Sequence, residues 1–306
     1  MAHKVFIDGD VGTTGLQIRE RLEQRADITL VKVAPDLRKD LSARLAAFAE
    51  ADVGILCLPD AAAKEVVAAC DAQGVKARII DASTAHRTAP GWTFGFPELA
   101  SAQRDAIRTA ERVSNPGCWS TCAIALLRPL VDAGVISPDA ALAISGVSGY
   151  SGGGKSMIEE FEGGAVNGSF LYATGQGHKH LPEITQYARL ARPPVFVPSV
   201  GDYAQGMAMA VQLHLPAGGM AQAEAALRAH YAGARFVTVV EAAAHQPRVW
   251  PQALNGTNRL ELSVQGNPET GSTVLVAVLD NLGKGASGAA VQNLNLMLGL
   301  DEATGL

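Results

Sequence analysis

A glycine-rich turn near the amino terminus constrains the fold more than any other feature of this sequence. Gly9, Gly12 and Gly15 lie between a short apolar strand pattern at 5–7 and a helix-spaced stretch at 16–22. This G-x-x-G-x-x-G spacing is a variant of G-x-G-x-x-G, in which missing side chains let backbone N–H groups approach a pyrophosphate at a helix start. Its place between a strand and a helix predicts a dinucleotide-binding unit, although an ordinary glycine-rich turn would share the local pattern.

Further apolar runs at 28–33, 53–58 and 77–81 predict more strands, with a helical stretch at 61–73 between the last two. The run at 53–58 is nearly continuous, which is typical of a parallel strand covered on both faces. The alternation predicts an α/β fold class with a Rossmann-type dinucleotide-binding domain over residues 1–116.

The end of the second strand bears on the choice of cofactor. An NAD site usually places an acidic residue there, for the ribose hydroxyls, whereas this chain reads Ala-Pro-Asp-Leu-Arg-Lys over 34–39. Arg38 and Lys39 are able to meet a 2′-phosphate, which favours NADP(H). Two basic residues at a helix start are also common on a solvated surface.

The stretch from Ser114 to Cys122 carries the candidate nucleophile. Asn115-Pro116-Gly117 forms a turn that delivers Cys118 to the start of an apolar, helix-like run at 122–131. The positive end of a helix dipole favours the thiolate, which is the reactive form of cysteine. The alternative is that Cys118 is a small buried apolar residue. For Cys122, one helical turn further on, packing in the core is the favoured interpretation.

A second group of titratable residues follows at 178–184, which reads His-Lys-His-Leu-Pro-Glu-Ile. His180 is the candidate general acid–base and His178 its competitor, because histidine titrates near neutral pH. Glu183 is a candidate either to orient one of them or to bind substrate. Pro182 suits the first turn of a helix, so the histidines are expected on the loop that enters it. No C-x-x-C or H-x-x-x-H pattern accompanies them, and we expect no metal site.

Beyond Cys118 the pattern changes to a predicted α+β domain over 117–285, with a mixed or antiparallel sheet. Strand-like runs recur, with one clear helix at 221–231; the strands are expected at 140–147, 195–197, 207–215, 236–240, 260–264 and 273–279. A mobile, donor-rich loop is expected at 148–155, where Lys155 is a candidate for an anionic group of the substrate. The final glycine-rich segment at 280–288 should feed an amphipathic helix, and residues 286–306 should pack back on the first domain.

Composition excludes several classes of function. The 306-residue chain has a net charge of −5 and no block of basic residues, which argues against nucleic acid as a partner. It has no apolar run long enough to span a membrane and no signal-peptide pattern at its start. The four cysteines lack the spacing of a disulfide scaffold, so we expect reduced thiols in a cytoplasmic protein.

Several motifs together resemble the phosphorylating aldehyde dehydrogenases, and in particular the shorter form of the N-acetyl-gamma-glutamyl-phosphate reductase family. The resemblance covers essentially the whole chain and is carried by the stretches 7–18, 114–118, 178–184 and 281–288, with Gln292-Asn293. The longer form usually has G-A-S-G-Y-T-G in its first loop and an S-A-D-F-R-type segment. Here 83–87 keeps the arginine but not the intervening side chains, which puts individual cofactor contacts in question rather than the chemistry.

The resemblance implies NADPH-dependent reduction of N-acetyl-L-glutamyl 5-phosphate to the 5-semialdehyde through a cysteine thioester, a step in arginine biosynthesis. It implies a small-molecule acyl-phosphate substrate and a homo-oligomer, either a dimer or a tetramer. The catalytic candidates are Cys118, His180, His178 and Glu183. The substrate-binding candidates are Asn115, Arg87 and Lys155. The cofactor-binding candidates are Gly9, Asp10, Gly12, Thr13, Thr14, Gly15, Arg38, Ser83, Asn281 and Lys284.

Two other interpretations remain open from the sequence. One is an enzyme like aspartate-semialdehyde dehydrogenase that acts on another acyl phosphate. The other is a non-catalytic NADP-binding regulator, in which Cys118 would sense oxidants.

Overall fold

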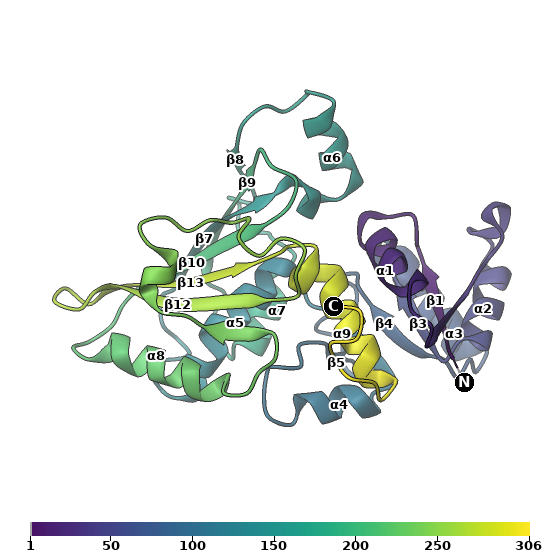
Figure 1. The fold of residues 1–306 in the computed structure, drawn as a ribbon, viewed down its shortest axis with the longest axis horizontal. Helices are drawn as coiled ribbons and strands as arrows, with labels where there is room; N and C mark the ends of the chain where they lie inside the picture. Colours follow the sequence, from purple (N-terminus) through teal and green to yellow (C-terminus); the bar gives the residue numbers. More distant parts are fainter. Residues whose placement is uncertain (1) are drawn as a thin grey trace. The chain divides into compact units, whose positions relative to one another are not determined.

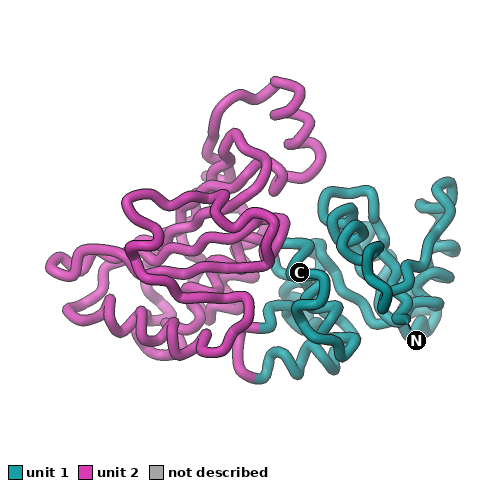
Figure 2. The backbone as a smooth tube through the Cα atoms, viewed as in Figure 1, with its two compact units in different colours: residues 1–97, 102–116, 286–306 teal, residues 98–101, 117–285 magenta. Residues whose placement is uncertain are grey.

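The computed structural model describes residues 2–306, which fold into two compact units (Figure 2). Unit 1 comprises residues up to 97, 102–116 and 286–306, and unit 2 comprises 98–101 and 117–285. The sequence-based division assigned 98–101 to the first domain, whereas in the structure this short excursion belongs to unit 2.

Unit 1 is built on a six-stranded parallel sheet with the order β2-β1-β3-β4-β6-β5. Its strands are β1 (His3–Asp8), β2 (Ile28–Val31), β3 (Val53–Leu56), β4 (Arg78–Asp81), β5 (Thr93–Phe94) and β6 (Arg112–Ser114). The strand order reverses beside β1, and ligands of such sheets bind outside the carboxyl ends of the strands at that point. The predicted Rossmann-type α/β fold is confirmed.

Helices cover this sheet and close its core (Figure 1). They are α1 (Thr13–Glu23), α2 (Leu41–Glu50), α3 (Asp60–Ala72), α4 (Gln103–Thr109) and α9 (Gly288–Met297). Apolar residues of β1, β3 and β4 pack with those of α1 and α9 in one cluster, and Phe6 and Leu56 pack with those of α2 and α3 in another.

The prediction that the last helix is amphipathic was wrong, because every residue of α9 is buried. The helix contacts α1, α4 and β4 of the same unit, so no side is left for solvent (Figure 1). Its polar side chains bond within the protein, as when the Asn293 amide donates to the carbonyl of Gly95 at 2.8 Å.

Unit 2 contains a seven-stranded mixed sheet with the order β11-β12-β13-β10-β7-β9-β8. Its strands are β7 (Ala143–Gly149), β8 (Phe170–Leu171), β9 (Val195–Gly201), β10 (Met207–His214), β11 (Val237–Val239), β12 (Leu260–Asn267) and β13 (Ser272–Leu279). The pairs β7–β9 and β11–β12 are parallel and the others antiparallel, as the predicted mixed sheet requires.

Two helices, α5 (Cys118–Asp132) and α8 (Gly219–His230), pack on this sheet, and α7 (Leu181–Tyr187) packs on α5. The segment expected as a mobile loop at 148–155 is instead a structured turn, with a 3₁₀ helix at Tyr150–Gly153 and then α6 (Lys155–Glu162). The N–H groups of Tyr150 and Ser151 donate to the carbonyls of Tyr203 and Ala204 at 2.9 and 3.0 Å, which fixes the turn.

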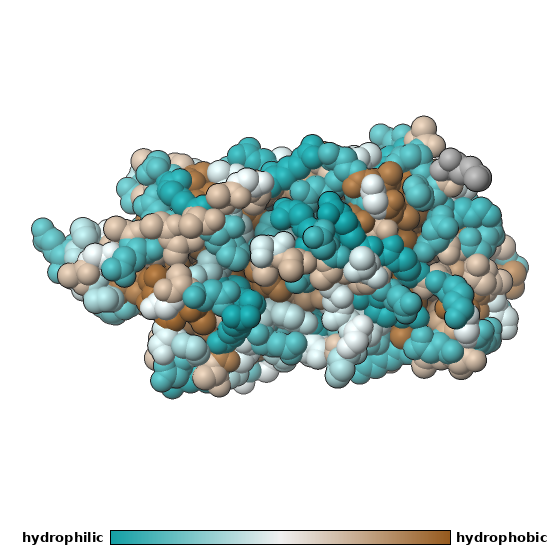
Figure 3. All heavy atoms as spheres, turned by 90° about the horizontal axis from the view of Figure 1, so that it is seen from below, coloured by the Kyte–Doolittle hydropathy of each residue, from teal (hydrophilic) through white to brown (hydrophobic). Residues whose placement is uncertain are grey.

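Among residues 2–306, no helix combines the length and apolar character needed to cross a bilayer. The face drawn in Figure 3 is largely hydrophilic, with apolar side chains in separate patches.

Candidate active site

The glycine turn of unit 1 has the geometry of an anion cradle. Gly9 has a φ of +93°, and a Cβ atom there would collide with the Cys57 carbonyl oxygen. A Cβ on Gly15 would likewise collide with the carbonyl oxygen of Gly9. No side chain caps the start of α1 at Gly12, which leaves the first-turn N–H groups of Thr13 and Thr14 for a ligand. The turn therefore fits the pyrophosphate of a dinucleotide.

A cavity of about 660 Å³ adjoins this turn at the carboxyl ends of β1 and β2. Basic side chains line it: Arg19, Lys32, Arg38, Lys39 and Arg44. Asp10 holds two of these cations, because its Oδ2 lies 3.2 Å from Arg19 Nη1 and 3.6 Å from Arg38 Nη2. Arg38 is thus placed at the wall of the cavity where the sequence predicted a 2′-phosphate contact.

The segment after β4 is organised by the buried carboxylate of Asp81. This carboxylate accepts hydrogen bonds from the backbone N–H and the hydroxyl of Ser83, at 2.9 and 2.8 Å, and lies 2.6 Å from His86 Nδ1. Ser83 thereby lies at the carboxyl end of the sheet, where a cofactor contact was expected.

Two residues predicted to bind substrate are engaged inside unit 1. Arg87 is buried and donates to the carbonyls of Asn115 and Ala82, at 3.0 and 3.4 Å. The Asn115 amide donates to the Ala286 carbonyl at 3.0 Å and accepts from Asn293 at 3.1 Å. Both side chains brace the turn that leads to Cys118, and their contact with substrate stays a prediction.

Cys118 is the first residue of α5, a helix of 15 residues with Gly117 at its N-cap. The helix therefore begins four residues earlier than the apolar run at 122–131 indicated. A thiol at this position lies beside the unpaired N–H groups and the positive end of the helix dipole. Cys122 is fully buried, and burial, followed by the charge of Cys118, raises its pKa well above the ordinary value. Cys122 is thus a core residue, as the favoured interpretation had it.

Glu183 connects the nucleophile turn to a histidine within unit 2. Its carboxylate is buried, and Oε2 accepts a hydrogen bond of 3.3 Å from the N–H of Gly117. The other oxygen, Oε1, lies 4.0 Å from His180 Nε2. His180 is the N-cap residue of α7 and Glu183 lies in the first turn of that helix, so one short helix presents both groups.

His178 has a different environment. Its Nδ1 accepts the backbone N–H of His180 at 3.1 Å, which places the proton of the neutral ring on Nε2. Its ring packs edge-on against Phe196 and His180, with centroid distances of 5.0 and 4.7 Å. Because Glu183 lies beside His180, the geometry favours His180 for proton transfer and His178 for holding the loop.

Sequence reasoning did not identify Tyr172, which lies close to this group. Trp119 follows Cys118 in α5, and its indole N–H donates to the Tyr172 hydroxyl at 2.8 Å. Burial, and after it the charge of Cys118, raise the pKa of Tyr172. Tyr172 therefore keeps its proton at neutral pH. Its only sequence signal is a position six residues before His178, which is no recognised spacing.

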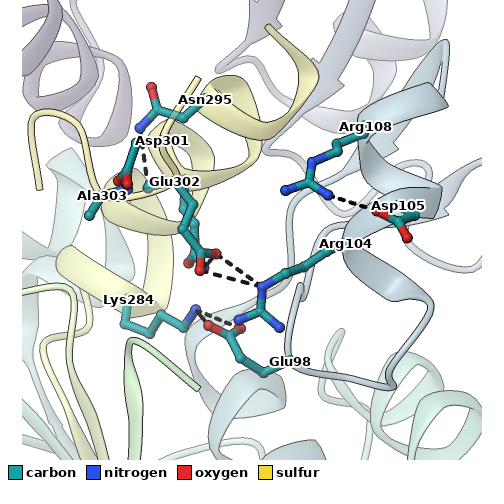
Figure 4. A network of polar contacts seen from close by, with 10 residues as sticks. Glu98, Arg104, Asp105, Arg108, Lys284, Asn295, Asp301, Glu302 and Ala303 are labelled. Carbon is teal, nitrogen blue, oxygen red and sulfur yellow. Dashed lines mark hydrogen bonds and ion pairs between the residues drawn. The ribbon is translucent and has the colours of Figure 1, made fainter. Parts of the chain in front are cut away.

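The remaining predicted residues lie in unit 2. Lys155 begins α6 with 80% of its side chain exposed and lies 3.8 Å from Glu159. Asn281 is buried and bonds to the Gly206 N–H and the Ser151 hydroxyl, at 2.7 and 3.0 Å. Lys284 is buried and paired with Glu98 (Figure 4). The side chains of Asn281 and Lys284 thus have protein partners, and their contact with the cofactor stays a prediction. Among residues 2–306, no group of three or more acidic, histidine or cysteine side chains is arranged to hold a metal ion.

Comparisons with known proteins agree with this division of the chain. Residues 21–110 match the NAD binding domain of semialdehyde dehydrogenases, and residues 118–281 match the dimerisation domain of the same enzymes.

Three curated relatives match over nearly their whole length. The chain is 51% identical to the N-acetyl-gamma-glutamyl-phosphate reductase 2 of Pseudomonas putida, covering 98% of each chain. It is 49% identical to the N-acetyl-gamma-glutamyl-phosphate reductase of a Chelativorans species, covering 97% of this chain and 99% of the relative. It is 51% identical to that of Burkholderia ambifaria, covering 98% and 97%.

Two solved structures share the fold at low sequence identity. The aspartate semialdehyde dehydrogenase II of Vibrio cholerae has a TM-score of 0.72 at 16% identity, covering 97% of this chain and 98% of that one. The aspartate semialdehyde dehydrogenase of Candida albicans, solved with NADP, has a TM-score of 0.69 at 13% identity, covering 97% and 99%.

Proposed function

The chain belongs to the N-acetyl-gamma-glutamyl-phosphate reductase family of semialdehyde dehydrogenases, and we propose that it catalyses the reaction of that name. The reaction is the NADPH-dependent reduction of N-acetyl-L-glutamyl 5-phosphate to N-acetyl-L-glutamate 5-semialdehyde and phosphate, in arginine biosynthesis. The observation that supports it best is the Glu183 carboxylate, which bonds the N-cap of the Cys118 helix and lies beside His180.

The first half of the reaction uses Cys118. Its thiolate attacks the acyl carbon, a C–S bond forms, and the C–O bond to phosphate breaks with release of inorganic phosphate. The first-turn N–H groups of α5 stabilise both the thiolate and the oxyanion that develops on the acyl oxygen. Glu183 keeps the turn at Gly117 in place by accepting its N–H.

The second half of the reaction uses His180. NADPH bound at the glycine turn of unit 1 would supply the hydride that reduces the thioester carbon. His180, held beside Glu183, donates a proton to the resulting oxygen, which gives a thiohemiacetal. As His180 takes the proton back, the C=O bond re-forms and the C–S bond breaks, which releases the aldehyde and restores the Cys118 thiolate.

An assay on three aldehydes tests the proposal. With phosphate and either NADP or NAD, we expect fast oxidation of N-acetyl-L-glutamate 5-semialdehyde and little oxidation of aspartate semialdehyde or glyceraldehyde 3-phosphate. A preference for aspartate semialdehyde would instead indicate an enzyme like aspartate-semialdehyde dehydrogenase. Binding of NADPH without turnover of any of the three would indicate a regulator.

Cofactor preference gives a second prediction, on Arg38. The Arg38→Ala variant should bind NADPH about 10-fold more weakly, because one charge-assisted contact to the 2′-phosphate is lost from a half-exposed cation. NADH binding should change little. Titration of cofactor fluorescence measures both, with Lys64→Ala as the control, since Lys64 does not line the cavity. An equal loss for NADPH and NADH would contradict the assignment.

We also propose that the protein is a cytoplasmic homo-oligomer that assembles through unit 2. The helices α5 and α8 pack on the sheet of this unit. The same sheet also borders a hollow of about 380 Å³, which is lined by Val147, Val197, Ala208, Ala210 and Leu171. Leu171 is an exposed apolar side chain, and the matching family domain is described as a dimerisation domain. All four cysteines are free thiols, which suits a reducing compartment.

A further inference from the structure

We propose that the buried ion pair of Glu98 and Lys284 is a positioning device that fixes Cys118 by holding Gly285 against it. The inference rests on the proposed role of Cys118 as the nucleophile, and it assigns Lys284 a purpose other than cofactor binding. All of these residues lie in unit 2.

The pair is sealed from solvent. Both side chains are only 1% exposed, and Lys284 Nζ lies 2.9 and 2.8 Å from the two carboxylate oxygens of Glu98 (Figure 4). The ammonium also lies 5.6 Å from the ring centroid of Phe236. The Glu98 carbonyl lies 3.0 Å from His230 Nε2, which fixes the acidic partner through its backbone. A buried pair is a poor source of net stability, because the cost of desolvation offsets the attraction, so its presence here is better explained by a role in geometry.

Lys284 is part of a π-helical turn at Gly283–Ser287, a rare conformation that is frequent at functional sites. The next residue, Gly285, donates its N–H to the Asp280 carbonyl at 3.0 Å. A Cβ atom on Gly285 would lie 2.8 Å from the Cβ of Cys118, closer than real Cβ contacts allow. The backbone of Gly285 therefore packs directly against the side chain of Cys118.

Polar side chains at 280, 281 and 284, before and within this turn, serve as anchors. Asp280 accepts the N–H groups of Leu282 and Gly256, at 2.9 and 2.8 Å. Asn281 bonds to the Gly206 N–H and the Ser151 hydroxyl, as described above. Lys284, two positions after Leu282, is held by Glu98. With its side chains fixed in this way, the turn offers Cys118 a rigid support.

The path of the chain points to the same role. Residues 98–101 leave unit 1 for unit 2 and return, and this excursion delivers Glu98 to Lys284. The pair carries no net charge, so its influence on the thiol is one of placement rather than of charge.

The test replaces both partners together, as Glu98→Gln with Lys284→Met, so that neither charge of the pair remains without the other. Alkylation of Cys118 by iodoacetamide is followed between pH 5 and 10 and resolved by peptide mass spectrometry, which needs no substrate. A Cys118 thiol displaced from the first-turn N–H groups of α5 loses part of the stabilisation of its thiolate, so we expect the alkylation rate at pH 7 to fall about 10- to 100-fold and the alkylation midpoint to move to higher pH. We expect kcat to fall by a similar factor, because small misplacements of a nucleophile are costly. NADPH affinity should stay within about twofold, since the pair does not touch the cofactor turn.

Two further variants complete the design. Glu261→Gln is the matched control, because Glu261 also pairs with a buried partner in unit 2, His245, at 3.4 Å, and should leave Cys118 alkylation unchanged. Gly285→Ala tests the support directly without altering any charge and should slow alkylation in the same way, whether or not the double variant folds.

Alkylation at the wild-type rate in Gly285→Ala, or in a folded double variant, would overturn the positioning role. Failure of the proposed function gives a different result, namely a wild-type protein whose Cys118 is alkylated readily but which turns over no acyl phosphate.

Discussion

Replacing Cys118 with alanine should abolish the phosphate-dependent reduction of NADP by N-acetyl-L-glutamate 5-semialdehyde, with a loss of at least about 10⁴-fold in kcat. The substitution removes only the sulfur at the first position of α5, and the remaining Cβ still rests on Gly285. No acyl–enzyme bond is then possible, and the other cysteine of the helix, Cys122, is fully buried and so unable to substitute for it. Steady-state kinetics with purified protein measures the loss.

Two controls separate this chemistry from a folding defect. NADPH affinity should be unchanged in Cys118→Ala, because the glycine turn and its cavity belong to unit 1. Cys122→Ala should retain turnover while lowering the melting temperature, because it removes packing beside Met207. Substantial activity in Cys118→Ala, or a larger loss in Cys122→Ala, would refute the assignment of the nucleophile.

Unit 1 could be predicted from the sequence because its signals are local. A parallel strand covered on both faces is a continuous apolar run, and β3 shows this plainly, with every residue from Val53 to Leu56 buried. The glycine spacing of the first turn follows from backbone sterics, which need no knowledge of distant residues. The helix α5 begins at Cys118, the residue that the predicted turn delivers to a helix start, and Trp119, Ser120 and Thr121 precede the apolar run at 122–131 within it.

The protein partners of buried polar groups could not be predicted from the sequence. Lys284, Asn281 and Arg87 are polar residues next to motifs, and each has a partner inside the protein. The partner of Lys284 lies 186 positions away in the chain, and no local pattern indicates such a pairing. The same holds for α9, whose polar residues imply a solvent-facing side that other elements of unit 1 in fact cover.

The candidate active site could be predicted from the sequence only in part. His180 and Glu183 are three positions apart at a helix start, so their proximity is readable from the sequence. The hydrogen bond between Glu183 and the N–H of Gly117 spans 66 positions, and no local pattern in the sequence indicates it. The sequence could therefore name the candidate acid–base group and the candidate nucleophile separately, whereas the structure shows one carboxylate that contacts both His180 and the N-cap of the Cys118 helix.

The histidine assignment gives the second large expected effect. His180→Asn should lower kcat by about 10²-fold or more, because the variant keeps a polar side chain at the N-cap of α7 but cannot shuttle a proton. His178→Asn is the comparison. Since His178 accepts the backbone N–H of His180 and packs on Phe196, its loss should misplace His180 and cost about 10-fold.

The two variants should also differ in how their rates depend on pH. His180→Asn removes the ionisation of the acid–base group, so the limb of the kcat profile that reports this group should disappear. His178→Asn should keep that limb, because the titrating ring is still present beside Glu183. If the limb vanishes in His178→Asn and survives in His180→Asn, the roles are reversed. The Nδ1 contact of His178 would then have to break during turnover to free that ring for proton transfer.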